Sequence, residues 1–426
     1  MIQEFSKINK VEGELNLPGD KSISHRAVMF SAMAKGTSRI YNLSNGEDVK
    51  STQACFKKLG IETKTVKDFV EVTGKGFKGF HKPESFLDAG NSGTTTRLIS
   101  GILAAQNFES VITGDESLSK RPMKRIITPL TAMGARITAS ENNTLPLKIF
   151  PGENLHAIKY ELPMASAQVK SAILLAGLHC DEETSVIERN PSRDHTERML
   201  GLKIEKSGSG KISYSSRKDY PDTKEYFVPS DISTAAFFIV LTLLSRNSLL
   251  RIKNVSLNES RTGILHVLIE MGGSIERESE RKAAGEPLGD LIIRGSELNN
   301  IIIPEEIIPN IIDEIPILSI AGIFADGNFT IRNASELRGK ETDRINAICS
   351  NLKRLSLDVE EYEDGFSFGG KIKNSNPVFD SFGDHRIAMA FGILSMQLHS
   401  GGKINNFDCV SISNPDFIRQ IQNITR

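Results

Sequence analysis

The chain has 426 residues, which is too long for one ordinary hydrophobic core, so we expect two or three domains. Its composition, with 39% hydrophobic and 25% charged residues, is typical of a soluble protein. Because 52 Lys and Arg residues balance 53 Asp and Glu residues and Trp is absent, the composition disfavours binding to nucleic acid or to a membrane surface.

Four widely spaced cysteines predict neither a disulfide framework nor a structural zinc site. They are Cys55, Cys180, Cys349 and Cys409. Residues 1–7 lack the apolar core of a signal peptide, and the longest strongly apolar run, Ala235–Leu244, is too short to span a bilayer. We therefore expect a cytoplasmic protein with no bound metal.

In chain order, the first predicted element is a strand over Val11–Leu17, where apolar residues alternate before Pro18. Six segments rich in small and apolar residues follow, and each begins at a polar capping residue. Segments that are apolar nearly all round are predicted to be buried helices. Their starts lie near Ser22, Ser92, Ser166, Asp231, Asp313 and Asp384.

The helix starts recur about every 71 residues, so six similar units would fill the chain. Each helix leads into a short strand, and most units continue with a second, amphipathic helix. A leucine or methionine followed by glycine is predicted to end this second helix. These ends are Leu59-Gly60, Met133-Gly134, Leu200-Gly201 and Met271-Gly272, with Leu355-Ser356 as a weaker copy.

Six repeated units suggest two similar halves of three units each. Two polar stretches, residues 211–225 and 273–290, are predicted to be surface loops. The boundary between the halves should follow the first of these loops. We expect one domain of residues 20–228, which ends at this boundary, and a discontinuous domain of residues 1–19 and 229–426. Each should layer sheets against buried helices.

The stretch Gly19-Asp20-Lys21-Ser22-Ile23-Ser24-His25-Arg26 spans the start of the first buried helix. The N–H groups at a helix N-terminus favour an anion, and the lysine and arginine add positive charge. Phosphate or carboxylate is therefore a natural ligand here. Taken alone, the stretch is explained equally well as a capped helix with solvated charges.

Seven further polar motifs lie at the starts of buried helices or in loops between units. They are Asn91-Ser92-Gly93-Thr94 with Arg97, Arg121-Pro122-Met123, Ser166-Ala167-Gln168, Arg193-Asp194-His195-Thr196-Glu197, Asp313, Lys340-Glu341 with Arg344, and Asp384-His385-Arg386. Each alone also has a structural explanation as a cap, a tight turn, a solvated loop or an ion-paired surface turn. Lys340 and Arg344, four residues apart, would share one face if that segment is helical.

Together these motifs supply more positive charge than one monoanion needs. The cations are Lys21, Arg26, Arg121, Lys340, Arg344 and Arg386, and they come from both halves. Such a set suits two phosphates, or a phosphate and a carboxylate, held in a cleft between the halves. Asp313 and Glu341 are the acids nearest this set and are suited to proton transfer.

In this order the motifs resemble those of the 5-enolpyruvylshikimate-3-phosphate synthase family, over nearly the whole chain from about Leu17 to Pro415. The Ser-Ala-Gln and Arg-Asp-His-Thr-Glu forms are similar to the bacterial branch called class II. The resemblance implies an α/β fold, namely a two-domain inverse α/β barrel of six βαβαββ-type repeats, three per domain, with the active site in the interdomain cleft.

The resemblance also implies an activity. The enolpyruvyl group of phosphoenolpyruvate would be transferred to the 5-hydroxyl of shikimate 3-phosphate, with release of phosphate, on the shikimate pathway to chorismate and the aromatic amino acids. No metal or organic cofactor is implied. The expected partners are the two small-molecule substrates, with no nucleic acid and no membrane, and the protein is expected to be a monomer.

Site residues are carried over from the same resemblance. Those that would bind shikimate 3-phosphate are Lys21, Ser22, Arg26, Ser166, Ala167, Gln168, Arg193, Asp313 and Lys340. Those that would bind phosphoenolpyruvate are Lys21, Asn91, Gly93, Arg121, Gln168, Arg344 and Arg386. As catalytic residues, Asp313 would take the proton of the 5-hydroxyl, while Glu341 and Lys21 would serve the methylene carbon and the departing phosphate.

One departure from the family pattern and two alternatives stay open. Residues 411–416 lack a lysine that many family members carry near this Pro-Asp turn, so no contact is assigned there. A UDP-N-acetylglucosamine enolpyruvyl transferase would have Gly-Ala-Lys-Asn where this chain has Gly19-Asp20-Lys21-Ser22, and usually a reactive cysteine before the arginine; this chain has none between Cys55 and Cys180. A non-catalytic phosphosugar-binding protein on the same scaffold would need the cations but neither Asp313 nor Glu341.

Overall fold

The computed structural model describes residues 1–374 and 376–425, which form two compact units. Unit 1 consists of Met1–Pro18, Ser230–Arg281 and Pro287–Arg426, and unit 2 consists of Gly19–Pro229 and Lys282–Glu286. Both units are discontinuous in sequence. The segment 282–286 differs from expectation, since the sequence pattern places it with residues 229–426 whereas it packs with unit 2.

The strands of unit 2 form three four-stranded sheets. They are β3 (Lys35–Tyr41), β4 (Glu62–Val66), β5 (Phe69–Lys75), β6 (Leu87–Asp88), β7 (Ser110–Thr113), β8 (Ile137–Thr138), β9 (Leu147–Ile149), β10 (Lys159–Glu161), β11 (Thr184–Glu188), β12 (Ile204–Ser207), β13 (Gly210–Ser215) and β14 (Glu225–Phe227). The sheet orders are β14-β3-β5-β4, β6-β7-β9-β8 and β10-β11-β13-β12. Each sheet joins one parallel pair to antiparallel strands; Ile40, for example, pairs with Tyr226 in parallel and with Val70 in antiparallel register.

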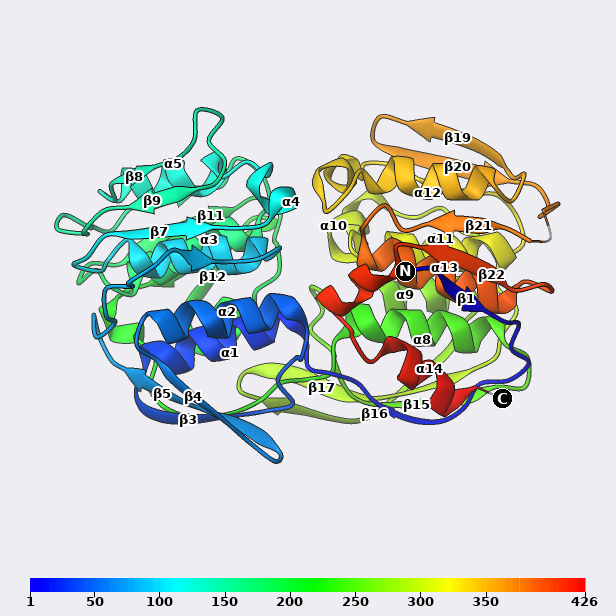
Figure 1. The fold of residues 1–426 in the computed structure, drawn as a ribbon, viewed down its shortest axis with the longest axis horizontal. Coiled ribbons are helices and arrows are strands. Elements are labelled where there is room, and N and C mark those ends of the chain that lie inside the picture. The colour runs from blue at the N-terminus through cyan, green and yellow to red at the C-terminus, as the bar shows by residue number, and fades with distance from the viewer. Residues whose placement is uncertain (375, 426) are drawn as a thin grey trace. The chain divides into compact units, whose positions relative to one another are not determined.

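The helices of unit 2 pack on these sheets and on one another. They are α1 (Lys21–Met33), α2 (Glu47–Lys58), α3 (Gly93–Leu103), α4 (Glu116–Ser119), α5 (Lys124–Ala132), α6 (Ala167–Gly177) and α7 (His195–Leu200). Figure 1 shows α1 and α2 above the sheet that contains β3, β4 and β5, and α3 contacts both α1 and α6. A Cβ atom at Gly101 would lie 2.1 Å from the carbonyl oxygen of Ala172, so glycine lets α3 and α6 approach closely.

Among the described residues of unit 1, the strands form one four-stranded and two three-stranded sheets. They are β1 (Gln3–Phe5), β2 (Glu12–Asn16), β15 (Leu249–Ser256), β16 (Ser274–Ala283), β17 (Glu286–Arg294), β18 (Phe329–Ile331), β19 (Asp358–Tyr362), β20 (Gly365–Gly369), β21 (Val378–Asp380) and β22 (Gly402–Asn405). The sheet orders are β16-β17-β15-β2, β18-β20-β19 and β1-β22-β21. The third sheet therefore joins the first strand of the chain to the last one.

The helices of unit 1 include a central group of three. They are α8 (Ile232–Leu244), α9 (Gly263–Glu270), α10 (Ile308–Ile311), α11 (Ile315–Phe324), α12 (Arg344–Lys353), α13 (His385–Gln397) and α14 (Phe417–Ile424). The helices α8, α11 and α13 contact one another pairwise and are almost completely buried. Because these helices are apolar nearly all round, burial in the middle of the unit is the arrangement that their composition requires. The mixed α/β architecture with several small sheets agrees with the fold class predicted from the sequence.

Two edge strands, β2 and β14, pair with strands that are far away in the sequence. β2 precedes α1 of unit 2, yet it pairs in parallel with β15 of unit 1. β14 precedes α8 of unit 1, yet it pairs in parallel with β3 of unit 2. The chain therefore passes between the units immediately after each of these strands, at Pro18 and Pro229.

The predicted helix starts and ends are confirmed to within two residues. Ser92, Ser166, Asp231 and Asp384 are N-caps of buried helices. The first helix is capped by Asp20 rather than Ser22, and the fifth begins at Ile315 rather than Asp313. Left-handed residues follow the second helices, with φ of 86° at Gly60, 92° at Gly134, 68° at Gly201, 101° at Gly272 and 61° at Ser356.

The prediction of surface loops is wrong for residues 273–290 and partly wrong for residues 211–225. The first stretch forms the hairpin of β16 and β17, and the second includes most of β13. β16 is an edge strand whose charged side chains are mostly exposed. Charged residues are common on such edges because they discourage pairing with other chains, so the composition of β16 resembles that of a loop.

Within residues 1–374 and 376–425, no single helix is long and apolar enough to cross a membrane. The segments Glu305–Ile311 and Ile315–Phe324 are long and apolar enough only when they are taken together as a bent pair. Most of α11 is buried inside unit 1.

Candidate functional site

In unit 2, the predicted site residues lie mainly at the N-terminal ends of α1, α3 and α6. Side-chain hydrogen bonds connect these three ends directly. Arg26 of α1 donates to Ser171 of α6 at 2.7 Å, and Gln168 of α6 donates to Thr94 of α3 at 3.0 Å. The structure therefore brings together residues that are 145 and 74 positions apart in sequence.

At the start of α1, Asp20 caps the helix by accepting a hydrogen bond from the backbone N–H of Ile23 at 2.9 Å. Lys21 is the first helical residue, and its Nζ lies 2.9 Å from Oδ2 of Asp48. The capped-helix explanation of this stretch is thus correct for Asp20. It does not account for Arg26, which is buried in the same helix.

Arg26 makes three hydrogen bonds, and all of them go to neutral oxygens. They are the hydroxyls of Thr196 and Ser171 and the carbonyl of Ser22, at 2.8, 2.7 and 2.9 Å. Burial lowers the pKa of Arg26 to about 10, although Glu197, Asp20 and Glu286 act in the opposite direction. The nearby charge of Arg193 lowers the pKa further, so the structure places these two predicted ligands close together.

At the start of α3, Ser92 caps the helix and Gly93 is its first residue. A Cβ atom on Gly93 would lie 2.8 Å from Nη1 of Arg97 and 3.6 Å from Nη1 of Arg121. Two guanidinium groups thus lie beside a glycine at a helix N-terminus, an arrangement that favours an anionic ligand. Nη2 of Arg121 also donates to Oδ1 of Asn91 at 3.0 Å, which joins Asn91 to the group.

The start of α6 contributes Ser166, Ala167 and Gln168. Ser166 caps the helix, and its hydroxyl accepts from the backbone N–H of Val169 at 3.4 Å. Gln168 accepts a hydrogen bond from Nη1 of Arg97 at 2.6 Å while its amide group donates to α3. Arg97 is therefore central to the cluster, although its motif in the sequence does not predict a role for it. Its signal is its position four residues after Gly93, one helical turn from the N-terminus.

A buried relay of hydroxyl groups connects α1 to α3 through α2. Nδ1 of His25 lies 2.6 Å from Oγ1 of Thr52, which lies 2.6 Å from Oγ1 of Thr95. Thr95 in turn donates to the capping hydroxyl of Ser92 at 2.8 Å. Burial, with help from the charges of Lys21 and Arg26, holds the pKa of His25 well below its usual value. This histidine is therefore a neutral connector rather than another cation.

In unit 1, four predicted residues surround Asp313, which lies between α10 and α11. Its Oδ1 lies 3.3 Å from Nη1 of Arg344 and 3.7 Å from Nζ of Lys340. Its Oδ2 lies 3.9 Å from Nη2 of Arg386. One carboxylate thus has three cations around it, and Glu341 adjoins the group through an ion pair of 2.7 Å with Arg344.

Arg344 is buried among carboxylates. Besides Asp313 and Glu341, it pairs with Asp384 at 2.8 Å. Burial alone would lower the pKa of Arg344, but the three acids outweigh it and raise the pKa above its ordinary value. Lys340 and Arg344 would share one face only if their segment were helical, and this condition is not met: Lys340 is the C-cap of a 3-10 helix (η3, Ser335–Gly339), and α12 begins at Arg344. An ion-paired surface turn is excluded for Arg344 by its burial.

Two acids outside the predicted set of site residues form ion pairs with these cations. Asp48 pairs with Lys21, and the buried Glu314 lies 3.6 Å from Nη1 of Arg386. Asp48 gives no sequence signal beyond an acid at a helix start, which is a common structural feature. Among the described residues, no group of three His, Cys, Asp or Glu side chains is arranged to hold a metal ion.

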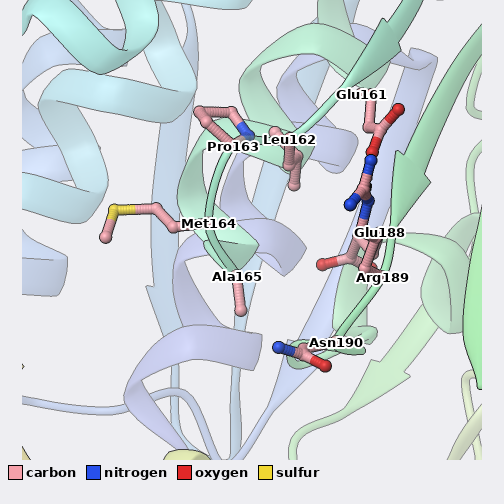
Figure 2. A pocket seen from close by; sticks show the side chains of 8 residues that line it. All are labelled: Glu161, Leu162, Pro163, Met164, Ala165, Glu188, Arg189 and Asn190. Atoms are coloured by element: carbon pink, nitrogen blue, oxygen red, sulfur yellow. Dashed lines mark hydrogen bonds and ion pairs between the residues drawn. The ribbon is translucent and has the colours of Figure 1, made fainter.

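Two cavities flank the segment that leads into α6. One has a volume of about 390 Å³ and is lined by Glu161, Leu162, Pro163, Met164, Ala165, Glu188, Arg189 and Asn190. Figure 2 shows Met164 extending away from the other labelled side chains. The second cavity, of about 370 Å³, shares residues 162–164 and reaches Ser166. Of the predicted site residues only Ser166 lines either cavity, so helix ends rather than these cavities define the candidate site.

Comparisons with known proteins agree over nearly the full length of the chain. The family model described as EPSP synthase (3-phosphoshikimate 1-carboxyvinyltransferase) matches residues 5–421. Proteins named 3-phosphoshikimate 1-carboxyvinyltransferase from Petrotoga mobilis and a Thermoanaerobacter species are 47% and 45% identical, with 99% and 98% of both chains covered. The structure of EPSP synthase from Acinetobacter baumannii is similar with a TM-score of 0.88 and 41% identity, covering 100% of this chain and 98% of that one. The enolpyruvyl transferase NikO from Streptomyces tendae, at 13% identity and a TM-score of 0.76, covers 100% of this chain and 97% of its own, and shares the fold.

Proposed function

The chain belongs to the EPSP synthase family, and we propose that it transfers the enolpyruvyl group of phosphoenolpyruvate to the 5-hydroxyl of shikimate 3-phosphate. The products are 5-enolpyruvylshikimate 3-phosphate and phosphate. The observation that carries this proposal is the pair of clusters described above. One joins Arg26 of α1 and Arg97 of α3 to polar groups of α6 at three helix ends of unit 2. The other is Asp313 with three cations around it in unit 1.

The reaction explains why these residue types are needed. The 5-hydroxyl oxygen adds to C2 of phosphoenolpyruvate while the methylene carbon gains a proton. Loss of phosphate and of a methyl proton then restores the double bond. A base at the hydroxyl, an acid and base at the methylene carbon, and fixed cations for the departing phosphate are therefore required.

We assign these tasks to residues in both units. Asp313 takes the proton of the 5-hydroxyl. Glu341 is the acid and base at the methylene carbon, and Lys21 supplies positive charge to the departing phosphate. Arg344 supports this assignment because it contacts Asp313 and Glu341 at 3.3 and 2.7 Å and fixes their positions. Lys340 and Arg386, on the other sides of Asp313, supply positive charge for the two anionic substrates.

Within unit 2 we divide the anion-binding residues between the two substrates. Shikimate 3-phosphate is assigned to Lys21, Ser22, Arg26, Ser166, Ala167, Gln168 and Arg193. Phosphoenolpyruvate is assigned to Lys21, Asn91, Gly93, Arg121 and Gln168, with Arg97 added. The low pKa of Arg26, caused by burial, supports its role, since a buried cation with neutral partners gains most from an anionic ligand.

A phosphate-release assay tests the proposal directly. Phosphate should appear only when shikimate 3-phosphate and phosphoenolpyruvate are both present. UDP-N-acetylglucosamine should not replace shikimate 3-phosphate as the acceptor, which separates the two enolpyruvyl transferases. If shikimate 3-phosphate binds but no phosphate is released with both substrates, the protein is a non-catalytic phosphosugar-binding protein and the proposed activity is wrong. Sedimentation of the purified protein tests the expected monomer.

A further inference from the structure

Arg193, a proposed ligand of shikimate 3-phosphate, precedes a helix that is too short to be stable alone. This helix, α7, has six residues, whereas isolated helices below about 12 residues are marginal in water. Its first three residues, His195, Thr196 and Glu197, are nevertheless buried. The position of Arg193 therefore depends on what holds these three side chains.

Thr196 and Glu197 are held by side chains of α1 and α6. Oγ1 of Thr196 accepts the hydrogen bond from Nε of Arg26 at 2.8 Å. Glu197 lies 2.8 Å from Nζ of Lys170, a residue of α6 that is equally buried. These two contacts connect α7 to α1 and α6.

His195 is held by a residue from a different part of the chain. Its Nδ1 lies 2.8 Å from Oε1 of Glu286, and both side chains are 1% exposed. Glu286 follows the turn between β16 and β17, in the segment 282–286 that packs with unit 2. At Gly285 a Cβ atom would lie 2.1 Å from the carbonyl oxygen of Arg198, so this turn lies directly against the backbone of α7.

The charge of Glu286 also reaches the site. It is one of three acids that raise the pKa of Arg26 against the larger effect of burial. Glu286 thus contacts the helix that follows Arg193, and it partly balances the charge of Arg26. Both arginines are proposed ligands of the same substrate.

We propose that Glu286 is a positioning residue for the shikimate 3-phosphate subsite. By holding His195 it fixes the start of α7, and with it Arg193 and the hydrogen bond between Thr196 and Arg26. The proposal rests on the function assigned above to these two arginines. It predicts an effect on shikimate 3-phosphate and not on phosphoenolpyruvate, which a general loss of stability would not produce.

The test compares variants of the full chain in direct binding and in steady-state kinetics. Glu286→Ala removes a buried hydrogen-bond partner and should raise the Kd for shikimate 3-phosphate, measured by calorimetry without phosphoenolpyruvate, about tenfold. The KM for phosphoenolpyruvate should change less than about twofold. Glu286→Gln keeps an acceptor for His195 and should recover most of the affinity. Glu276→Gln, on an exposed part of β16, is the matched control and should bind like the wild type.

The outcomes separate this proposal from the proposed function. If the wild type neither binds shikimate 3-phosphate nor releases phosphate, the proposed function fails. If the wild type binds but Glu286→Ala binds equally well, or weakens both substrates equally, the positioning role is wrong. Should Glu286→Ala fail to fold, Glu286→Asp replaces it under the same criteria, because a shorter side chain keeps the charge but withdraws the carboxylate from His195.

Discussion

Substitution of Gly93 by alanine should weaken phosphoenolpyruvate binding without harming the fold. Gly93 is the first residue of α3 and does not adopt a left-handed conformation, so alanine fits its backbone. The added methyl group would lie 2.8 Å from Nη1 of Arg97, where ordinary contact begins at 3.4 Å, so the guanidinium must move by about 0.6 Å. Arg97, which is hydrogen-bonded to Gln168 at 2.6 Å, is assigned to phosphoenolpyruvate alone, so its movement affects mainly that substrate. Gln168, which is assigned to both substrates, keeps its other hydrogen bond to Thr94.

The size of the effect follows from these hydrogen bonds. A hydrogen bond to a charged group contributes about 1.5–3 kcal/mol, and a partial loss of about 1.4 kcal/mol corresponds to tenfold. We therefore expect Gly93→Ala to raise the KM for phosphoenolpyruvate about tenfold while the KM for shikimate 3-phosphate stays within about twofold. Steady-state kinetics measures both KM values, and thermal denaturation measures the melting temperature, which should stay unchanged. Equal changes for the two substrates, or a lower melting temperature, would show that Gly93 serves only a tight turn and would refute the reasoning.

Three further variants test other parts of the structure. Asp313→Ala should keep shikimate 3-phosphate binding by calorimetry but lower kcat about 10²–10⁴-fold, as loss of a general base does; near-normal turnover would place the base elsewhere. Lys170→Ala leaves two buried glutamates without their cation and should lower the free energy of unfolding in urea by about 3–5 kcal/mol; a loss below about 1 kcal/mol would contradict this. Burial lowers the pKa of His179 from 6.5 to about 4, so the unfolded chain takes up its proton first and stability is lost as the pH falls from 6.5 toward 4. His179→Gln should flatten this dependence, whereas His266→Gln at an exposed site should not.

The features that the sequence predicted well are governed by local chemistry. Each buried helix begins near a polar residue because the first N–H groups of a helix need acceptors. The second helices end at glycine because the following residue adopts a left-handed conformation, as at Gly60 and Gly272. Both signals lie within a few residues of the feature that they predict.

The features that the sequence did not predict depend on distant contacts. The expected domain bounds include β2 and β14, but their pairing with β15 and β3 is specified by no local pattern. β16 was mistaken for a loop because an exposed edge strand needs no apolar face. The segment 282–286 packs with unit 2 through a buried hydrogen bond between residues 91 positions apart, His195 and Glu286.

The candidate site shows the same division. The motifs at the starts of α1 and α3 contain their own cations, the motif at the start of α6 supplies polar groups, and the resemblance to a family relates the three. The partners of these cations carry no comparable signal. Asp48, the partner of Lys21, lies 27 residues further along the chain and outside every predicted motif, whereas the three acids around Arg344 all lie within predicted motifs.

Two buried arginines of the site, Arg26 and Arg344, have different surroundings, and we infer different roles for them from this difference. Arg344 contacts three carboxylates, and they raise its pKa, so its charge is already balanced and it holds Asp313 and Glu341 in place. Arg26 bonds to neutral oxygens, and burial lowers its pKa to about 10. Bringing an anion to Arg26 restores the favourable interactions that its guanidinium lost on leaving water, whereas Arg344 gains little from another anion. Of the two, Arg26 should therefore contribute more to substrate affinity, and Arg344 more to the geometry of the acids that transfer protons.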